Sequence, residues 1–145
     1  MRVSLPGLLT VLVVLSGKAL AGDSIDVRII VEGFRNNNGT CRVLLFDNRR
    51  GFPDSPGEAV AMCSATIEGP TVSFGLKVVP GKYAVAVLHD ENSNGRLDKS
   101  WYGKPIEGFG ASNQPKVGFG PPTFGESVVL LDENNTHLTI PLNYL

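Results

Sequence analysis

The sequence predicts an all-β protein, a single antiparallel β-sandwich of about seven short strands of the immunoglobulin or transthyretin kind. Apolar and polar side chains alternate with a period of two along several short segments, which is the pattern of half-buried strands. The 17 glycines and 10 prolines favour turns between such segments. No segment shows a convincing helical period, so strands are expected throughout.

The first two strands are expected within residues 24–46. Residues 24–34 place apolar side chains on one face and charged side chains on the other, which predicts a half-buried strand. Residues 35–39 suit a turn, because Asn and Gly tolerate a positive φ. Residues 41–46 follow as a second strand, so the two strands are predicted to form a hairpin.

The remaining strands are expected after a hydrophilic connection that contains two prolines. They are residues 59–67, 71–78, 82–89, 123–131 and 136–142. The third of these segments is apolar on both faces, which predicts a central strand that is covered on two sides. The last two are predicted to form a terminal hairpin.

Residues 90–122 show no periodicity and are rich in Gly and Asn. Connections are usually about 4–6 residues long, and much longer ones are commonly functional or disordered. This segment carries the aromatic residues Trp101, Tyr102, Phe109 and Phe119, which argue against plain disorder. We therefore expect one long folded loop.

Residues 1–21 have the pattern of a signal peptide rather than of a folded element. Arg2 gives a positive start, residues 8–15 form an apolar stretch, and Ala19 and Ala21 are the small residues that signal peptidase needs. The alternative is a buried N-terminal strand or helix. We expect cleavage after Ala21, a single domain over residues 22–145, and export to the periplasm or the extracellular space.

The overall charge excludes some classes of partner. Lys and Arg number 13 and Asp and Glu number 14, which gives a formal net charge of -1. Such a chain lacks the basic surplus of a nucleic-acid-binding protein. It also lacks the surplus expected of a membrane-surface binder, and its mature part has no apolar run long enough for a transmembrane helix.

Two cysteines, Cys41 and Cys63, fall within the part expected to be exported. An oxidising compartment favours a structural disulfide between them. The bridge would close a loop of about 22 residues and stabilise the protein by about 3 kcal/mol. A redox-active pair or a thiolate metal site is the alternative, but redox pairs usually have the Cys-x-x-Cys spacing, which is absent.

A calcium-loop pattern begins at residue 90. Calcium prefers hard oxygen ligands, which alternate positions of a curling loop can supply. The expected ligands are the side chains of Asp90, Asn92, Asn94 and Asp98 and the carbonyl of Arg96, with a sharp turn at Gly95. Trp101 stands where an EF-hand has its bidentate Glu, so a more distant carboxylate, Glu107 or Glu91, would have to complete the set.

The same residues also suit a loop that is held only by hydrogen bonds. Asp and Asn side chains accept from nearby backbone N–H groups in Asx-turns, and a strand exit needs such a turn. The sequence leaves both interpretations open, a calcium site and a metal-free turn.

No catalytic motif is present, and the sequence predicts a protein that is not an enzyme. Gly-x-Ser-x-Gly and His-Glu-x-x-His are both absent. His89 and His137 are conceivable general bases, and the acidic residues of the loop are conceivable glycosidase carboxylates. His89 at a strand end is more typical of a structural hydrogen-bonding residue.

Three segments together resemble a known bacterial family. They are residues 80–87 (PGKYAVAV), residues 89–98 (HDENSNGRLD) and residues 103–113 (GKPIEGFGASN), and residues 119–124 (FGPPTF) also fit. The pattern resembles the bacterial domain-of-unknown-function family 2141, with Ser93 where Gly is expected. The resemblance implies an exported bacterial protein with a small β-fold, and it supplies no substrate.

The residues of this signature are mainly polar and lie on a loop, which points to a site more readily than to packing. The predicted recognition surface comprises Trp101, Tyr102, Phe109, Ser112 and Asn113, although the aromatic residues could instead form a small satellite core. We expect a non-catalytic exported protein whose calcium-ordered loop presents this surface to an envelope protein or a glycan. The alternatives are a metal-free envelope-protein- or carbohydrate-binding module and, third, a glycan hydrolase.

Overall fold

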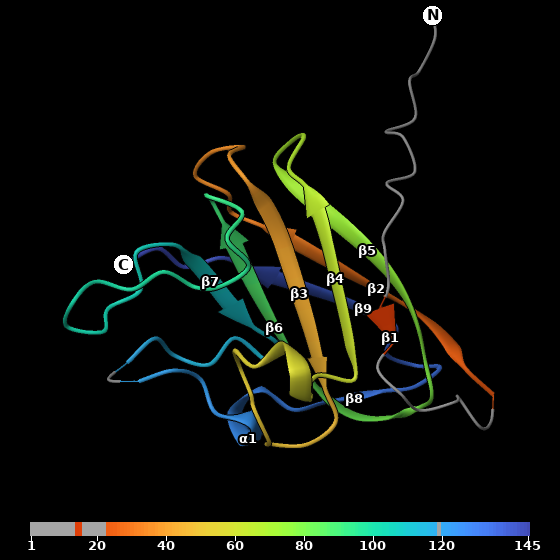
Figure 1. Cartoon of the computed structure of the whole chain (residues 1–145). Coiled ribbons are helices and arrows are strands. Elements are labelled where there is room, and N and C mark those ends of the chain that lie inside the picture. The colour runs from red at the N-terminus through yellow and green to blue at the C-terminus, as the bar shows by residue number, and fades with distance from the viewer. Residues whose placement is uncertain (1–13, 16–22, 119) are drawn as a thin grey trace, which may run out of the picture.

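The computed structural model describes residues 14–15, 23–118 and 120–145, which form two β-sheets packed face to face (Figure 1). The predicted all-β sandwich is therefore confirmed. Apart from residues 14–15, the predicted signal peptide lies outside the described residues. No described helix is both long enough and apolar enough to cross a membrane.

The larger sheet has β6 near its centre, and the smaller sheet has three strands. In the larger sheet the strand order is β1 (Val14–Leu15), β4 (Ala61–Thr66), β3 (Thr40–Phe46), β6 (Gly81–Asp90) and β7 (Gly108–Ala111), and β8 (Val129–Leu131) also pairs with β6. The smaller sheet is ordered β5 (Thr71–Val78), β2 (Ile25–Glu32) and β9 (His137–Pro141). Two short helices, η1 (Pro56–Glu58) and α1 (Phe124–Ser127), lie in the connections.

The core lies between the two sheets and follows the alternation of the sequence. Every second residue of β5 is buried, from Val72 to Val78, and the same holds for Val27, Ile29 and Val31 of β2. β6 is buried on both faces from Ala84 to Val87, because one face meets the core and the other is covered by loops. The predicted central position of this strand is confirmed.

Both predicted hairpins are wrong. β2 and β3 lie in opposite sheets, and so do β8 and β9, so each connection crosses the sandwich. β9 pairs with β2 in parallel, whereas the other strand pairs are antiparallel. A period of two identifies a strand and its buried face, but it does not identify the partner strand.

The sequence predicted that the long segment after β6 is a loop without regular structure. The structure corrects this prediction. The segment contains β7, which pairs with β6 from Ala86 to His89. The strand was missed because two of its four residues are glycines. A Cβ at Gly108 would lie 2.5 Å from the Tyr144 ring, and one at Gly110 would lie 2.6 Å from the carbonyl oxygen of Pro141. Close packing thus replaces the alternating side chains that mark other strands.

The predicted disulfide is absent, and Cys41 and Cys63 are free, buried thiols. In the pairing of β3 with β4, Cys41 lies opposite Ala65 and Cys63 lies opposite Val43. The cysteines are thus diagonal neighbours, for which about 7–8 Å is typical, whereas a disulfide needs Cβ atoms about 3.5–4.5 Å apart. Burial raises the pKa of Cys41 to about 12 and that of Cys63 to about 11, so both thiols stay protonated.

Candidate functional site

The chain leaves β6 through what we call the polar loop, residues 90–98 together with Glu107. Asp90 is 1% exposed, and its two carboxylate oxygens accept from the backbone N–H of Asn94 (3.1 Å) and of Gly95 (2.7 Å). Gly95 has a φ of 82°, which favours glycine. Asp90 therefore forms the turn of the loop by charge-assisted hydrogen bonds.

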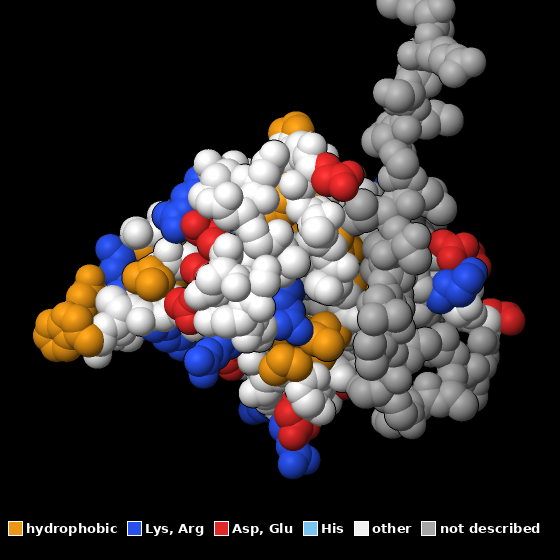
Figure 2. All heavy atoms as spheres, turned by 45° about the horizontal axis from the view of Figure 1, so that its top comes forward, with side chains coloured by type: hydrophobic (Ala, Val, Ile, Leu, Met, Phe, Trp, Pro, Cys, Tyr) orange, Lys and Arg blue, Asp and Glu red, His pale blue; other side chains and the backbone are white. Residues whose placement is uncertain are grey.

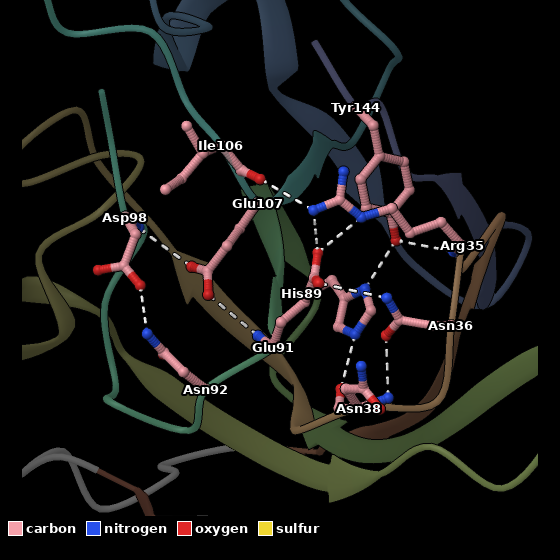
Figure 3. A network of polar contacts seen from close by, with 10 residues as sticks. All are labelled: Arg35, Asn36, Asn38, His89, Glu91, Asn92, Asp98, Ile106, Glu107 and Tyr144. Atoms are coloured by element: carbon pink, nitrogen blue, oxygen red, sulfur yellow. Dashed lines mark hydrogen bonds and ion pairs between the residues drawn. The ribbon is translucent and has the colours of Figure 1, made fainter. Parts of the chain in front are cut away.

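Glu107 closes the polar loop from the other side. Its Oε1 accepts from the N–H of Glu91 (3.1 Å) and its Oε2 accepts from the N–H of Asp98 (3.0 Å), as Figure 3 shows. The side chain is nearly buried, and burial raises its pKa. The charges of Asp98 and Asp90 raise this pKa further, while the two N–H donors lower it. One carboxylate thus joins both ends of the loop.

The asparagines of the polar loop bind to the chain itself. The side-chain amides of Asn92 and Asn94 donate to the Asp98 carboxylate (2.6 and 2.7 Å), and the bond from Asn94 is the main cause of the lowered pKa of Asp98. The amide oxygens accept from the N–H groups of Asn94 and Arg96 (3.2 and 3.1 Å). These are the contacts of the hydrogen-bonded turn.

The structure thus brings together the predicted calcium-ligand side chains of Asp90, Asn92, Asn94 and Asp98, Arg96 joins them through its N–H, and Glu107 joins them through the backbone. Their side-chain oxygens accept from N–H groups of the chain. Within the described ranges, no group of three or more His, Cys, Asp and Glu side chains is arranged so that it could hold a metal ion. Calcium binding stays a prediction.

His89 is fully buried beside the polar loop, and both ring nitrogens have partners. Nε2 lies 2.7 Å from the carbonyl oxygen of Asn38, and Nδ1 lies 2.7 Å from the hydroxyl of Tyr144. A carbonyl can only accept, so Nε2 carries the proton of a neutral ring and Nδ1 accepts from Tyr144. The Tyr144 oxygen in turn accepts from the N–H of Arg35 (3.2 Å). His89 is therefore a satisfied structural residue.

The side chain of Glu91 points away from the rest of the polar loop, toward Arg35 and Asn36 (Figure 3). It forms an ion pair with Arg35, whose Nε donates to Oε1 (2.7 Å), and it accepts from the amide of Asn36 (3.2 Å). Burial acts to raise the pKa of Glu91, but the bonds from Asn36 and Arg35 outweigh it and lower the pKa. Glu91 therefore fixes the β2–β3 connection against the loop.

The predicted recognition surface does not form one surface. Trp101 and Tyr102 stand at an exposed tip, 96% and 63% accessible, whereas Phe109 is half-buried. Ser112 is buried, accepts from the N–H of Val85 and donates to the carbonyl of Ser127. Asn113 donates to the carbonyl of Glu126 (2.9 Å). Ser112 and Asn113 therefore have structural roles. Phe119 lies outside the described residues.

A cavity of about 340 Å³ opens on the outer face of the larger sheet. Its floor consists of Leu44, Ala86, Leu88 and Phe109, which share that face because they pair across β3, β6 and β7. Its walls are loops that precede β4, connect β6 to β7 and connect β7 to α1. The apolar outer face of residues 82–89 was the only sequence signal for such a covered surface.

Among the described residues, the lining of the cavity carries four cationic side chains and one side-chain carboxylate, that of Asp54. The cations are Arg42, Arg96, Lys99 and Lys104. The ion pairs found among the described residues are Arg35–Glu91, Arg50–Glu58 and Lys77–Asp26, and none involves these four. Sequence reasoning missed Arg42, Lys99 and Lys104, because nothing in the local pattern marks them.

Arg42 is the most enclosed of these cations. It is half-buried on β3, directly opposite Leu88, with one guanidinium nitrogen against Gly95 and another 3.0 Å from the sulfur of Met62. A thioether is a weak acceptor, and a guanidinium has five donors. Most of the hydrogen-bonding capacity of Arg42 is therefore unused by the described part of the chain.

The fold and the site define a two-sheet all-β domain whose polar loop supports one wall of a cavity. The chain belongs to the family described as "Uncharacterized protein conserved in bacteria (DUF2141)", whose family model matches residues 29–139. No curated protein and no solved structure matches the chain. The resemblance seen in the sequence is confirmed, and the family description names no activity.

Proposed function

We propose that this chain is an exported, non-catalytic binding protein that takes a small amphiphilic anion into the cavity on the larger sheet. The observation that carries the proposal is an apolar floor beneath a cationic lining. The volume of about 340 Å³ suits a small ligand, since ligand cavities typically measure about 300–1,000 Å³. The expected signal peptide supports export.

The apolar part of the ligand would rest on Leu44, Leu88 and Phe109. Leu44 and Leu88 are only half-buried although they belong to central strands. Burying the rest of such side chains is favourable at about 25 cal/mol per Å². A ligand with an apolar chain or ring therefore gains free energy by covering this floor.

The anionic group would bind at Arg42, which lies opposite Leu88 on the same face. Lys99 and Lys104 add positive charge at the lining, while Arg96 also acts on Asp98, whose pKa it helps to lower. A carboxylate, phosphate or sulfate can use the two parallel donors of a guanidinium. The unused donors of Arg42 thus favour an anion over a neutral ligand.

The composition of the lining supports binding without catalysis. Apart from Asp54 and Tyr102, its described titratable side chains are the four cations. His89 and Glu107, which are the more reactive candidates, are held in the hydrogen bonds described above. A nucleophile with an adjacent general base, the usual signature of covalent catalysis, is not found among the lining residues.

Displacement of a neutral fluorescent probe tests the proposal. N-phenyl-1-naphthylamine should bind the purified protein, and decanoate should displace it at a concentration roughly tenfold lower than decan-1-ol does. Arg42→Gln should abolish this preference for the anion, whereas Lys116→Gln, an exposed residue outside the lining, should keep it.

A bulky side chain on the floor provides the matched control for location. Leu88→Trp should prevent probe binding, while Leu130→Trp, at an exposed position on β8 outside the lining, should not. Equal binding by both variants would show that the cavity is not the site. Equal displacement by decanoate and decan-1-ol would show that the site does not select anions.

Calcium at the polar loop is our second proposal; Asp90, Asp98 and Glu107 would have to turn from their N–H donors toward the ion, because their described arrangement does not form a metal site. They lie close enough for the first two to raise the pKa of the third, and a cation would relieve that repulsion. Calcium should then raise the melting temperature of the protein relative to EDTA, and Asp98→Asn should remove the rise. Identical melting temperatures in EDTA and in millimolar calcium would contradict calcium binding and favour the metal-free turn.

A further inference from the structure

Residues 99–105 form a tight turn that projects from the body of the molecule, and we call it the aromatic hairpin. Lys99 and Pro105 form a β-bridge at its base. The N–H of Ser100 donates to the carbonyl of Lys104 (2.7 Å), and that of Gly103 donates to the carbonyl of Ser100 (2.9 Å). In Figure 1 it is the teal loop that extends beyond the sheets at the left. The hairpin is thus closed by its own hydrogen bonds.

The tip of the hairpin carries Trp101 and Tyr102. Their rings contact each other edge to face, with centroids 5.2 Å apart and an interplanar angle of 85°. Trp101 is 96% exposed, whereas Phe46 and Phe74 are almost completely buried. A large apolar pair held in water by an ordered turn typically marks an interaction surface.

Positive charge lies on both sides of the aromatic tip. Lys99 precedes it and Lys104 follows it, both exposed, and Arg96 lies shortly before Lys99 in the sequence. The neighbouring carboxylates, Asp98 and Glu107, are held in the hydrogen bonds of the polar loop. Figure 2 shows hydrophobic side chains at the left end of the molecule, with Lys and Arg side chains, and some Asp and Glu side chains, beside them toward the body of the molecule. The whole-chain charge of -1 conceals this local surplus.

We propose that the aromatic hairpin docks onto an anionic lipid surface. Trp101 and Tyr102 enter the interfacial layer, where amphipathic rings are stable, and Lys99 and Lys104 contact the anionic headgroups. Lys99, Tyr102 and Lys104 also line the cavity, but the proposal rests on the exposed tip of the hairpin and does not depend on a ligand in the cavity.

The shape of the tip favours a lipid surface over a glycan. Residues 99–105 contain no Asp, Glu, Asn or Gln, so the hairpin lacks the carboxylate and amide side chains that accept hydrogen bonds from several sugar hydroxyl groups at once. The two rings are nearly perpendicular and stand on a projecting turn, so they do not form a flat platform for a sugar ring. A projecting tip can enter a soft interface without a matching concave partner.

Trp101 is the single tryptophan of the chain, so its fluorescence reports directly on the hairpin. Vesicles of phosphatidylcholine with about a third phosphatidylglycerol should shift its emission to shorter wavelength, and brominated lipid should quench it. Pure phosphatidylcholine vesicles should have little effect, because each lysine near an anionic surface contributes about 1 kcal/mol. No shift with anionic vesicles, or an equal shift with neutral ones, would overturn the proposal.

Variants locate the contact by vesicle sedimentation. Lys99→Gln/Lys104→Gln should weaken binding roughly tenfold to thirtyfold. Lys82→Gln/Lys116→Gln removes the same charge at exposed positions outside the hairpin and should bind like the parent. Trp101→Ala/Tyr102→Ala should abolish binding, and Leu88→Trp should not reduce it, because the lipid surface does not act through the cavity. Loss of binding in Leu88→Trp alone, or a Trp101 shift with peptidoglycan fragments but not with lipid, would contradict the proposal.

Discussion

The polar loop and the cavity lie close together on the larger sheet, but they differ in whether their charged side chains have hydrogen-bond partners within the chain. In the polar loop, Asp90 and Glu107 direct all four carboxylate oxygens at backbone N–H groups. In the cavity, the hydrogen-bond partner of the Arg42 guanidinium among the described residues is a thioether sulfur, and Lys99 and Lys104 lie in no described ion pair.

This difference separates residues that build the fold from residues that are free to bind. A buried carboxylate with two N–H donors is strongly stabilising, and its loss leaves donors without partners. A half-buried guanidinium without a carboxylate partner costs free energy until an anion arrives. The residues that look most like a site in the sequence are therefore the supports, and the less conspicuous cations are the binding candidates.

Asp90→Ala should have the largest effect and tests whether the polar loop is a support. It removes two charge-assisted hydrogen bonds and leaves the N–H groups of Asn94 and Gly95 without their acceptors, which costs about 3–5 kcal/mol. Urea unfolding measures the loss. Asp54→Ala, an exposed carboxylate of the cavity, should change the free energy of unfolding by less than about 0.5 kcal/mol. Similar losses in both variants would remove the distinction between the two regions.

Glu91 and Glu107 should give opposite pH dependences of stability. The pKa of Glu107 is raised above its ordinary value of 4.5, so the folded state binds more protons and its stability falls as the pH rises from 4.5 through the raised pKa. The pKa of Glu91 is lowered, so its contribution is complete above 4.5 and is lost as the pH falls through the lowered pKa.

Urea unfolding between pH 3 and pH 8 measures both effects. The stability advantage of the parent over Glu91→Gln should grow as the pH rises, whereas its advantage over Glu107→Gln should shrink. Each variant serves as the control for the other, because both remove one carboxylate next to the same loop. Parallel curves for the two variants would show that the two carboxylates do not differ in this way.

The sequence predicted the strands far better than their partners. The alternation in β2, β5 and β6 identified elements and buried faces, because that pattern is local. Sheet membership depends on contacts between distant segments, so both hairpins were wrong. β7 was missed because glycines that allow close approach of Tyr144 and Pro141 replace its alternating side chains.

The candidate site divides in the same way. Asp90, Asn92, Asn94, Gly95 and Asp98 were identified because turn formation and calcium binding require the same residue types at the same spacing. Sequence spacing alone cannot separate the two uses, since both depend on oxygens that point inward. The cavity depends on Arg42 and Leu88, which meet only when β3 pairs with β6, and on loops that fold over them. No local pattern contains that information.

Arg42→Gln should leave the stability of the ligand-free protein within about 0.5 kcal/mol of the parent, or raise it slightly. The substitution removes a half-buried charge that lacks a carboxylate partner in the described chain, and it keeps an amide that can still form hydrogen bonds. Urea unfolding of the ligand-free protein measures it. A loss above about 2 kcal/mol would mean that Arg42 supports the fold as Asp90 does.

Trp101→Ser is expected to have the smallest effect of these substitutions on the free energy of unfolding. Because the indole is 96% exposed and its described ring contact is with Tyr102, its removal forfeits little buried area. The edge-to-face contact of two exposed rings accounts for at most about 1 kcal/mol. Thermal melting should therefore show a change of only a few degrees, with Phe74→Ser, a fully buried residue of β5, as the contrasting variant that unfolds at far lower temperature. A large loss in Trp101→Ser would mean that the aromatic hairpin packs on the body of the protein in solution, and the tip would then not be available to a lipid surface.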